Sequence, residues 1–224
     1  MTFFNQEALR YDEWYTTPMG RLVDQVETQL AMSMFPIKAG MHVLDAGCGT
    51  GNFSLKLLQK GVKVTGIDVS QEMLAIARKK IEAAEMTAAF LEMDIYRLDF
   101  PDNTFDGILS MAAFEFIHAP EEALKELFRV LKPGGHLLVG TINGASAWGE
   151  LYTSPAFQKN TVFQHASFKT IKEMEAWNAS QLISTGSCLF LPPDTPETQW
   201  TLEAENQCRQ NGGGGFICAL WKKQ

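Results

Sequence analysis

A glycine-rich segment follows the first strand-like hydrophobic run of the chain, and its residue types suit ligand binding. Residues 43–51 are Val-Leu-Asp-Ala-Gly-Cys-Gly-Thr-Gly, with a glycine at every second position after Asp45. Glycine lets the backbone turn through positive φ, and it lets a ligand approach main-chain atoms with no Cβ in the way. The pattern therefore predicts a ligand-binding turn built mostly from backbone.

The spacing of these glycines separates the segment from a dinucleotide-binding fingerprint. That fingerprint is G-x-G-x-x-G, and it rests a pyrophosphate on a helix N-terminus. Residues 45–51 follow D-x-G-x-G-x-G instead, which closely resembles motif I of the class I S-adenosylmethionine (SAM) methyltransferases. The resemblance implies that SAM is the cofactor and that five residues of the turn bind it, namely Asp45, Gly47, Gly49, Thr50 and Gly51.

Acidic residues stand at the ends of the next two predicted strands. Asp68 follows the strand pattern of residues 62–67, where a carboxylate can grip a ribose diol with two hydrogen bonds. NAD carries the same diol, so Asp68 suits either cofactor. Asp94 follows residues 88–93. In the methyltransferase family an acid at this position accepts a hydrogen bond from the adenine amino group, and the alternative for Asp94 is an exposed loop acid.

The same resemblance assigns further contacts to the cofactor. The backbone of Ile95 is expected to contact the adenine ring. Met73 packs on adenine or is ordinary core, since methionine at helical spacing serves either purpose. Ser110 and Met111 end the fourth predicted strand, where the family positions the methionine portion of SAM.

No residue is an obligate catalytic group, and three residues are candidates. Glu115 and His118 follow the fourth strand and can face the acceptor as a general base. For His118, the alternative is a role at the start of the helix that Pro120 opens. Tyr15 lies in an aromatic N-terminal segment that resembles the lid of some relatives, where a tyrosine closes over the cofactor. A buried aromatic cluster is the alternative there.

The resemblance extends over roughly residues 40–145 and includes several independent motifs. Residues 98–106 and 120–143 closely resemble the small-molecule, UbiE-like branch of the family. Enzymes of the family that methylate exocyclic amines of nucleic acids carry an Asn/Asp-Pro-Pro-aromatic tetrad after strand 4. Residues 110–113 are Ser-Met-Ala-Ala, so the tetrad is absent.

Strands and amphipathic helices alternate from Met41 onward, which indicates βαβ units. We expect an α/β fold with a Rossmann-like, doubly wound, mostly parallel seven-stranded sheet, helices on both faces and an antiparallel last strand. The expected strands are 42–45, 62–67, 88–93, 107–111, 136–142, 186–191 and 215–222. The expected helices span residues 52–60, a segment that begins after Ser70, a segment that begins at Pro120, and part of 168–182. In the helix after Ser70 we expect an apolar face of Met73, Leu74, Ala77, Ile81 and Ala84.

We expect one methyltransferase domain over residues 1–224. Within it, residues 1–38 form an N-terminal helical cap and residues 39–142 the SAM-binding core. Residues 143–185 have a looser pattern and form a substrate-binding insertion or lid. Residues 186–224 supply the C-terminal strands.

Composition limits the partners and the compartment. The net charge is −7 over 224 residues and the pI is near 5.1, which opposes binding to phosphate backbones, so we expect no nucleic-acid partner. The four cysteines lack C-x-x-C spacing, so we expect free thiols and no metal site. No apolar run is long enough for a membrane span, and no secretory signal is visible, so we expect a cytoplasmic protein.

These expectations combine into a SAM-dependent methyltransferase that acts on a small-molecule substrate by in-line methyl transfer, with S-adenosylhomocysteine as product. Three alternatives stay open: an NAD-dependent oxidoreductase, a non-catalytic SAM-binding protein, and a protein or RNA methyltransferase. The sequence leaves the acceptor, the methylated atom and the oligomeric state open.

Overall fold

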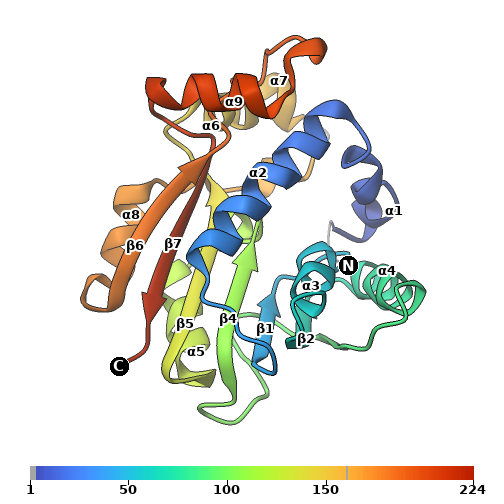
Figure 1. Ribbon diagram of the computed structural model, residues 1–224, viewed down its shortest axis with the longest axis vertical. Coiled ribbons are helices and arrows are strands. Elements are labelled where there is room, and N and C mark those ends of the chain that lie inside the picture. Colours follow the sequence, from blue (N-terminus) through green and yellow to red (C-terminus); the bar gives the residue numbers. More distant parts are fainter. Residues whose placement is uncertain (1–3, 160) are drawn as a thin grey trace.

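A computed structural model describes residues 4–159 and 161–224, and its centre is one seven-stranded sheet (Figure 1). The strand order is β3-β2-β1-β4-β5-β7-β6. Neighbours from β3 to β5 are parallel, whereas β7 is antiparallel to both β5 and β6. The strands are β1 (His42–Ala46), β2 (Lys63–Asp68), β3 (Ala89–Glu92), β4 (Phe105–Met111), β5 (Leu131–Ile142), β6 (Leu182–Cys188) and β7 (Phe216–Lys222). The expected fold class is confirmed.

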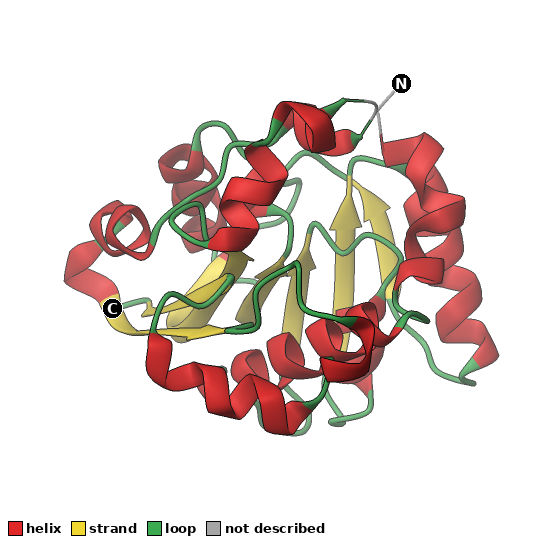
Figure 2. Cartoon of the chain, turned by 90° about the horizontal axis from the view of Figure 1, so that it is seen from above, coloured by secondary structure: helices red, strands yellow, loops and turns green. Residues whose placement is uncertain are grey.

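Helices cover both faces of the sheet, as Figure 2 shows from above. One core cluster joins α2 and α3 to one face, and a second joins α5 and α8 to the other. The helices are α1 (Phe4–Trp14), α2 (Pro18–Met34), α3 (Asn52–Leu58), α4 (Gln71–Ala83), α5 (Pro120–Val130), α6 (Ala147–Thr153), α7 (Pro155–Gln158), α8 (Ile171–Trp177) and α9 (Leu202–Cys208). Because both faces are covered, the central strands are almost wholly buried, as expected for a parallel sheet.

Local signals account for where several helices begin. Thr17 caps α2 by accepting a hydrogen bond from the Gly20 amide, and Pro18 follows at the first helical position. Ser70 caps α4 in the same way, as expected. The buried face of α4 is Met73, Leu74, Ala77 and Ile81. Ala84 was expected on that face but is exposed, because it is the C-cap residue that ends the helix.

Two strands, β5 and β6, differ from the expected ranges by more than two residues, and the other five by one or two residues at an end. Strand β6 runs from Leu182 to Cys188, not from 186 to 191. It ends early because Leu189 has φ +64° and the Glu205 carboxylate, from α9, accepts the amide hydrogens of Phe190 and Leu191 at 2.8–2.9 Å. Strand β5 begins at Leu131, which pairs with Phe105 of β4, and residues 132–135 form an irregularity in the ladder.

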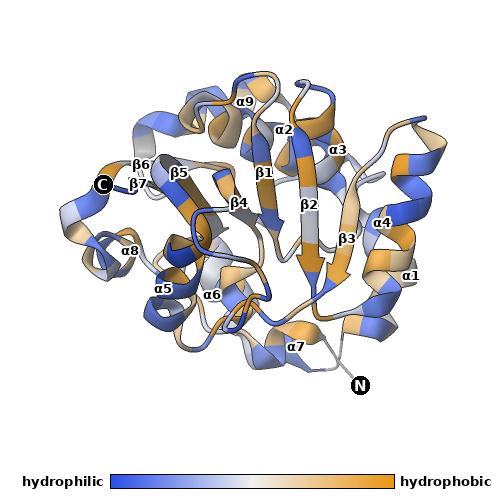
Figure 3. Cartoon of the chain, turned by 90° about the horizontal axis from the view of Figure 1, so that it is seen from below, coloured by the Kyte–Doolittle hydropathy of each residue, from blue (hydrophilic) through white to orange (hydrophobic). Residues whose placement is uncertain are grey.

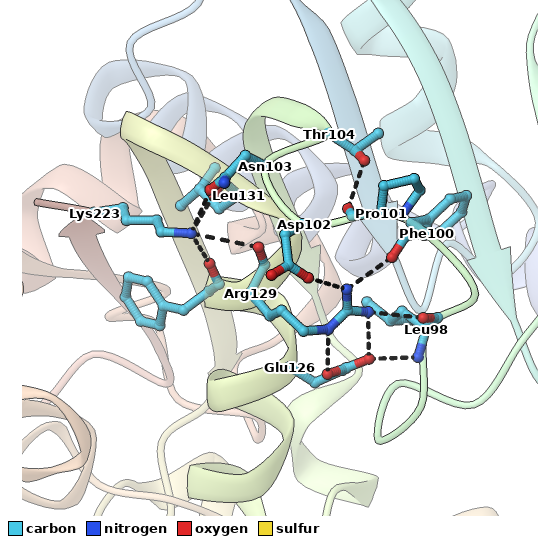
Figure 4. Close-up of polar contacts among 11 residues, drawn as sticks. Leu98, Phe100, Pro101, Asp102, Asn103, Thr104, Glu126, Arg129, Leu131 and Lys223 are labelled. Atoms are coloured by element: carbon cyan, nitrogen blue, oxygen red, sulfur yellow. Dashed lines mark hydrogen bonds and ion pairs between the residues drawn. The ribbon is translucent and has the colours of Figure 1, made fainter.

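Residues 98–106 connect β3 to β4 and are bound to α5 by one arginine (Figure 4). The Arg129 guanidinium donates to the carbonyls of Leu98 and Phe100 at 2.8 Å, and it forms ion pairs with Asp102 and Glu126. Lys223 donates to the Leu131 carbonyl at 2.6 Å. These bonds replace the crossover helix that other parallel connections in the sheet use.

The outer surfaces of the helices are mainly hydrophilic, and hydrophobic residues follow the strands (Figure 3). Among the helices that the structure describes, none has the length and apolar character needed to cross a bilayer.

Candidate active site

The predicted site residues gather at the carboxyl ends of β1–β4. Strand β1 lies between β2 and β4. From β1 the chain continues to β2 and β3 on one side, and it then crosses to β4 on the other side. Ligands of open α/β sheets bind at such a switch point, outside the carboxyl ends of the strands. In Figure 1, helices α1, α6 and α7 overlie this edge of the sheet.

The glycine turn adopts the left-handed backbone that its sequence predicted. Gly47, Gly49 and Gly51 have φ of +75°, +51° and +78°. A Cβ on Gly47 would lie 2.6 Å from the Cβ of Ala113, so the turn packs directly on the segment after β4. A Cβ on Gly49 would meet nothing within 4 Å. The space beside Gly49 is open to a ligand.

The Asp68 carboxylate borders this open space. One oxygen accepts the Gly49 amide at 2.9 Å and the other accepts the Ser70 amide at 2.9 Å. Burial raises the pKa of Asp68, and the two amide bonds oppose that effect. An ionised carboxylate has about four acceptor positions, so Asp68 can still bind two hydroxyls of a ribose. The turn and Asp68 therefore fit the adenosine part of SAM.

The side chains of Asp45 and Thr50 are turned toward protein. Asp45 is 1% exposed, accepts a 2.6 Å bond from the Ser54 hydroxyl of α3, and has a pKa raised to about 7 by burial. Thr50 is 1% exposed and donates to Asp12 at 2.7 Å. Their side chains hold the turn in place, and a contact with the cofactor stays a prediction for both.

The residues predicted around adenine differ in exposure. Asp94 is exposed and accepts the Tyr96 amide at 3.0 Å, which fixes the turn after β3. Ile95 is 6% exposed and Met73 only 2%. Asp94 is thus exposed to solvent, whereas Ile95 and Met73 belong to the packed interior. The roles of all three residues toward adenine remain predictions.

The residues that end β4 are buried. Ser110 donates from its hydroxyl to the Ala46 carbonyl at 2.7 Å and thereby ties β4 to β1. Met111 is 6% exposed and belongs to the core on the α2 face. Ala112 follows with φ +52°, an uncommon conformation for a residue with a Cβ, and it turns the chain toward Glu115.

Helix α1 is bound over the glycine turn by Asp12. Its carboxylate accepts from Thr50 and forms an ion pair with Lys80 of α4 at 2.9 Å. Ser70 donates to Asn5 at 2.8 Å, farther along α1. Helix α1 is therefore bonded both to the segment that follows β1 and to the segment that follows β2, where it can cover a bound cofactor.

Of the three catalytic candidates, Glu115 is buried, Tyr15 is half-buried and His118 is exposed. Glu115 is 1% exposed and accepts the Thr141 hydroxyl at 2.9 Å. Burial raises its pKa to about 7. Tyr15 bonds the Tyr11 hydroxyl at 3.4 Å, and burial together with nearby negative charge raises its pKa.

Two residues near this group have no counterpart among the sequence predictions. Glu27 is 9% exposed and lies on the buried side of α2, between Val23, Val26 and Ala31. Tyr152 of α6 packs against the same core. The signal for Glu27 is visible in the sequence, since an acidic residue interrupts an apolar stripe at helical spacing. Tyr152 lies in a segment without clear periodicity and gives no such signal.

Comparison with known proteins identifies the family. Residues 44–139 match the methyltransferase domain family. A demethylmenaquinone methyltransferase of Thermus thermophilus is 44% identical over 46% of this chain and 47% of its own length. A malonyl-[acyl-carrier protein] O-methyltransferase of Pectobacterium atrosepticum is 40% identical over 51% of this chain and 44% of its own length. The chain thus matches about half the length of these curated relatives.

A solved structure is similar over almost the whole chain. It is a SAM-dependent methyltransferase from Thermotoga maritima, described as a possible histamine N-methyltransferase, with 25% identity and a TM-score of 0.76. The similarity covers 99% of this chain and 98% of that chain. The sequence matches and this fold favour a methyltransferase over the NAD-dependent oxidoreductase. Residues 44–139 of this chain therefore belong to the methyltransferase domain family, within a fold shared with a SAM-dependent methyltransferase.

Proposed function

We propose that the chain binds SAM at the glycine turn and transfers its methyl group to a small-molecule acceptor. The observation that carries the proposal is the open space beside Gly49, bordered by the Asp68 carboxylate. Gly47 and Gly51 give the turn its shape, and Met73, Asp94 and Ile95 are proposed to hold adenine. When bound, SAM supplies a methyl group on a positively charged sulfur, ready for in-line displacement.

The protein's own contribution is alignment and exclusion of water. Helix α1, bound through Asp12, covers the turn, and the segment after β4 is packed on Gly47. Holding two reactants in near-attack geometry can contribute on the order of 7–11 kcal/mol to lowering a barrier, which is a large part of what such a transfer requires. A dedicated base is needed only where the acceptor must first lose a proton.

The acceptor is proposed to bind between the N-terminal helices and the segment after β4. Residues 1–38 would act as the cap and residues 143–185 as the insertion that adds Tyr152 to the wall. The net charge of −7 opposes nucleic acid as the acceptor, and a cytoplasmic location agrees with this composition. The three named relatives act, by their names, on different acceptors, so the names do not select one for this chain.

Calorimetric titration of the protein with SAM and with NAD tests the cofactor. We expect SAM to bind and NAD not to bind, and the reverse result would contradict the proposal. Incubation with labelled SAM and separate pools of metabolites, protein and RNA then tests the acceptor. We expect S-adenosylhomocysteine to form with the metabolite pool. Binding of SAM with no product from any pool would favour a non-catalytic SAM-binding protein.

A further inference from the structure

Five acidic and phenolic side chains from different segments are buried or half-buried and interact electrostatically through Glu27. They are Tyr11 of α1, Tyr15 directly after α1, Glu27 of α2, Glu115 after β4 and Tyr152 of α6; we call them the acid–tyrosine cluster. Burial is the largest cause that raises the pKa of each tyrosine and of Glu27 itself; negative charge on Glu27 adds to this effect at all three tyrosines, and that on Glu115 adds to it at Tyr11, Tyr152 and Glu27. Glu27 is therefore within electrostatic reach of the other four side chains.

Of the two acids in the cluster, Glu27 is the one without a hydrogen-bond donor among the described residues. Its residue is 9% exposed, yet no described residue donates a hydrogen bond to its carboxyl group. The sealed polar side-chain atoms without a partner, among the described residues, are in Gln181 and Trp221. The Glu27 oxygens are thus unbonded but not sealed by protein, which leaves them accessible to a small ligand.

The nearest lysines are engaged elsewhere. Lys56 pairs with Asp24 and donates to the Thr28 hydroxyl at 2.7 Å. Lys169 donates to the Ser167 carbonyl, and its charge lowers the pKa of Glu115. Lys169 therefore balances part of the charge of Glu115. The charge of Lys56 likewise lowers the pKa of Glu27, but no described cation forms a hydrogen bond or an ion pair with the Glu27 carboxyl group.

Aromatic rings complete the surroundings of the two acids. The Tyr11 and Tyr15 rings meet edge to face at 5.7 Å between centroids. Tyr152 stacks on Phe163 at 4.4 Å, and Phe163 lies 6.2 Å from Phe168. The faces of aromatic rings attract cations, and an unpaired buried carboxylate requires a positive partner. Both features repel a carboxylate ligand and favour an ammonium.

We propose that the methyl acceptor is a small molecule with a basic amine, and that the unpartnered Glu27 carboxylate binds this amine as an ammonium ion among the tyrosines. This inference rests on the proposed function and adds the chemical class of the acceptor. Glu27 acts in it as a specificity residue. Glu115, at the end of the same cluster, is placed to receive a proton from the ammonium.

The cationic sulfur of SAM is the competing partner for Glu27. A carboxylate that balances the sulfonium would favour SAM over S-adenosylhomocysteine, which has a neutral sulfur. A carboxylate that binds the acceptor would leave the ratio of these two affinities unchanged. The ratio therefore separates the two roles.

The test uses three probes of the same shape, 2-phenylethylamine, 2-phenylethanol and 3-phenylpropionate. Their dissociation constants are measured by ligand-observed NMR on the full chain, with and without saturating S-adenosylhomocysteine. We expect the amine to bind at least about tenfold more tightly than the alcohol or the acid. In Glu27→Gln the affinity for the amine should fall by about tenfold or more, because a buried charge pair loses one member.

Matched variants make the result specific. Glu13→Gln removes one negative charge from an exposed site on α1 and should leave all three affinities unchanged. Glu27→Asp retains the charge and should retain the preference for the amine. The preference of the wild-type protein needs no variant at all, so the proposal stays testable even where Glu27→Gln is unstable.

Three results would overturn the proposal: no binding of the amine, equal affinity for the three probes, or an amine affinity that Glu27→Gln leaves unchanged. A lower ratio of SAM to S-adenosylhomocysteine affinity in Glu27→Gln, with amine binding intact, would assign Glu27 to the sulfonium. Failure of both SAM and S-adenosylhomocysteine to bind would instead refute the proposed function. The two failures can be told apart because amine binding is also measured in the absence of S-adenosylhomocysteine.

Discussion

The acidic side chains around the glycine turn, on the cofactor side, differ in their hydrogen bonding from Glu27 and Glu115, on the side proposed for the acceptor. Asp45 accepts from Ser54, Asp68 accepts two backbone amides, and Asp12 pairs with Lys80. On the acceptor side, Glu115 has one hydroxyl donor and Glu27 has no described donor. The cofactor side is fully hydrogen-bonded in the folded chain, whereas the acceptor side retains a buried acid, Glu27, whose pKa burial raises and to which no described residue donates.

This difference has a physical basis in what each side binds. A turn of backbone amides and small residues can be fully hydrogen-bonded and still present open space, as beside Gly49. A pocket that selects its ligand by charge must leave that charge unpaired until the ligand arrives, at a cost in stability. Changes on the cofactor side should therefore lower stability and SAM affinity together. Changes on the acceptor side should alter stability without an equal change in SAM affinity.

The largest effect is expected from Gly47→Ala. The residue has φ +75°, and a Cβ would lie 2.6 Å from Ala113, so backbone strain and overpacking add. We expect a loss of roughly 2–5 kcal/mol in the free energy of unfolding, with SAM binding abolished. Urea denaturation and calorimetry measure the two effects. Gly40→Ala, with φ +83° and nothing within 4 Å, is the control for strain alone; equal losses in both variants would contradict the close packing at Gly47.

The next effect is expected from Asp68→Asn. The substitution removes the charge that accepts the Gly49 and Ser70 amides and borders the ligand space. Hydrogen bonds to charged groups contribute roughly 1.5–3 kcal/mol, so SAM affinity should fall by about ten- to a hundredfold. Asp94→Asn is the matched strand-end control and should have a smaller effect, since Asp94 is exposed. SAM affinity unchanged in Asp68→Asn, with the fold retained, would refute the ribose assignment.

A smaller effect is expected in the pH dependence of stability. Burial raises the pKa of Glu115 from 4.5 to about 7, so the folded state holds the extra proton across this interval. Stability from this group is complete below pH 4.5 and is lost as the pH rises through 7. Glu115→Gln should therefore gain on the order of 1–2 kcal/mol relative to wild type between pH 5 and pH 8.

Thermal unfolding at the two pH values measures this difference. The pKa of Asp45 is also raised to about 7, so Asp45→Asn is the comparison on the cofactor side. It should show a similar change between the two pH values, because loss of the 2.6 Å bond to Ser54 lowers stability equally at both and cancels in the difference. A pH dependence that is the same in wild type and in Glu115→Gln would argue against a proton on buried Glu115.

The smallest effect is expected from Asp12→Ala. This variant loses the Thr50 bond and the ion pair with Lys80, both partly exposed to solvent. We expect about 0.5–1.5 kcal/mol lower stability and faster proteolysis within α1. Limited proteolysis with mass spectrometry locates the cleavage. Glu13→Gln, one residue along the helix, should be cleaved like wild type; equal protection of Asp12→Ala would show that Asp12 does not hold the cap.

Features that depend on neighbours in the sequence were predicted well. Positive φ in the turn follows from Gly47, Gly49 and Gly51, and the cap of α4 follows from Ser70. Features that depend on distant residues were not. Strand β6 ends before Phe190 because Glu205, fifteen residues later, takes the amide that a longer strand would have used.

The sequence by itself determined the parallel sheet, the glycine turn and the order of the acids that follow it, because strand periodicity and glycine conformation are local properties. Only the tertiary structure decided that Asp45 and Thr50 hold the turn from within while Asp68 borders the ligand space. It also decided that Glu27, from the second helix, comes within electrostatic reach of Glu115 and three tyrosines. Whether a buried charge has a partner depends on segments far apart in the chain, and packing alone brings them together.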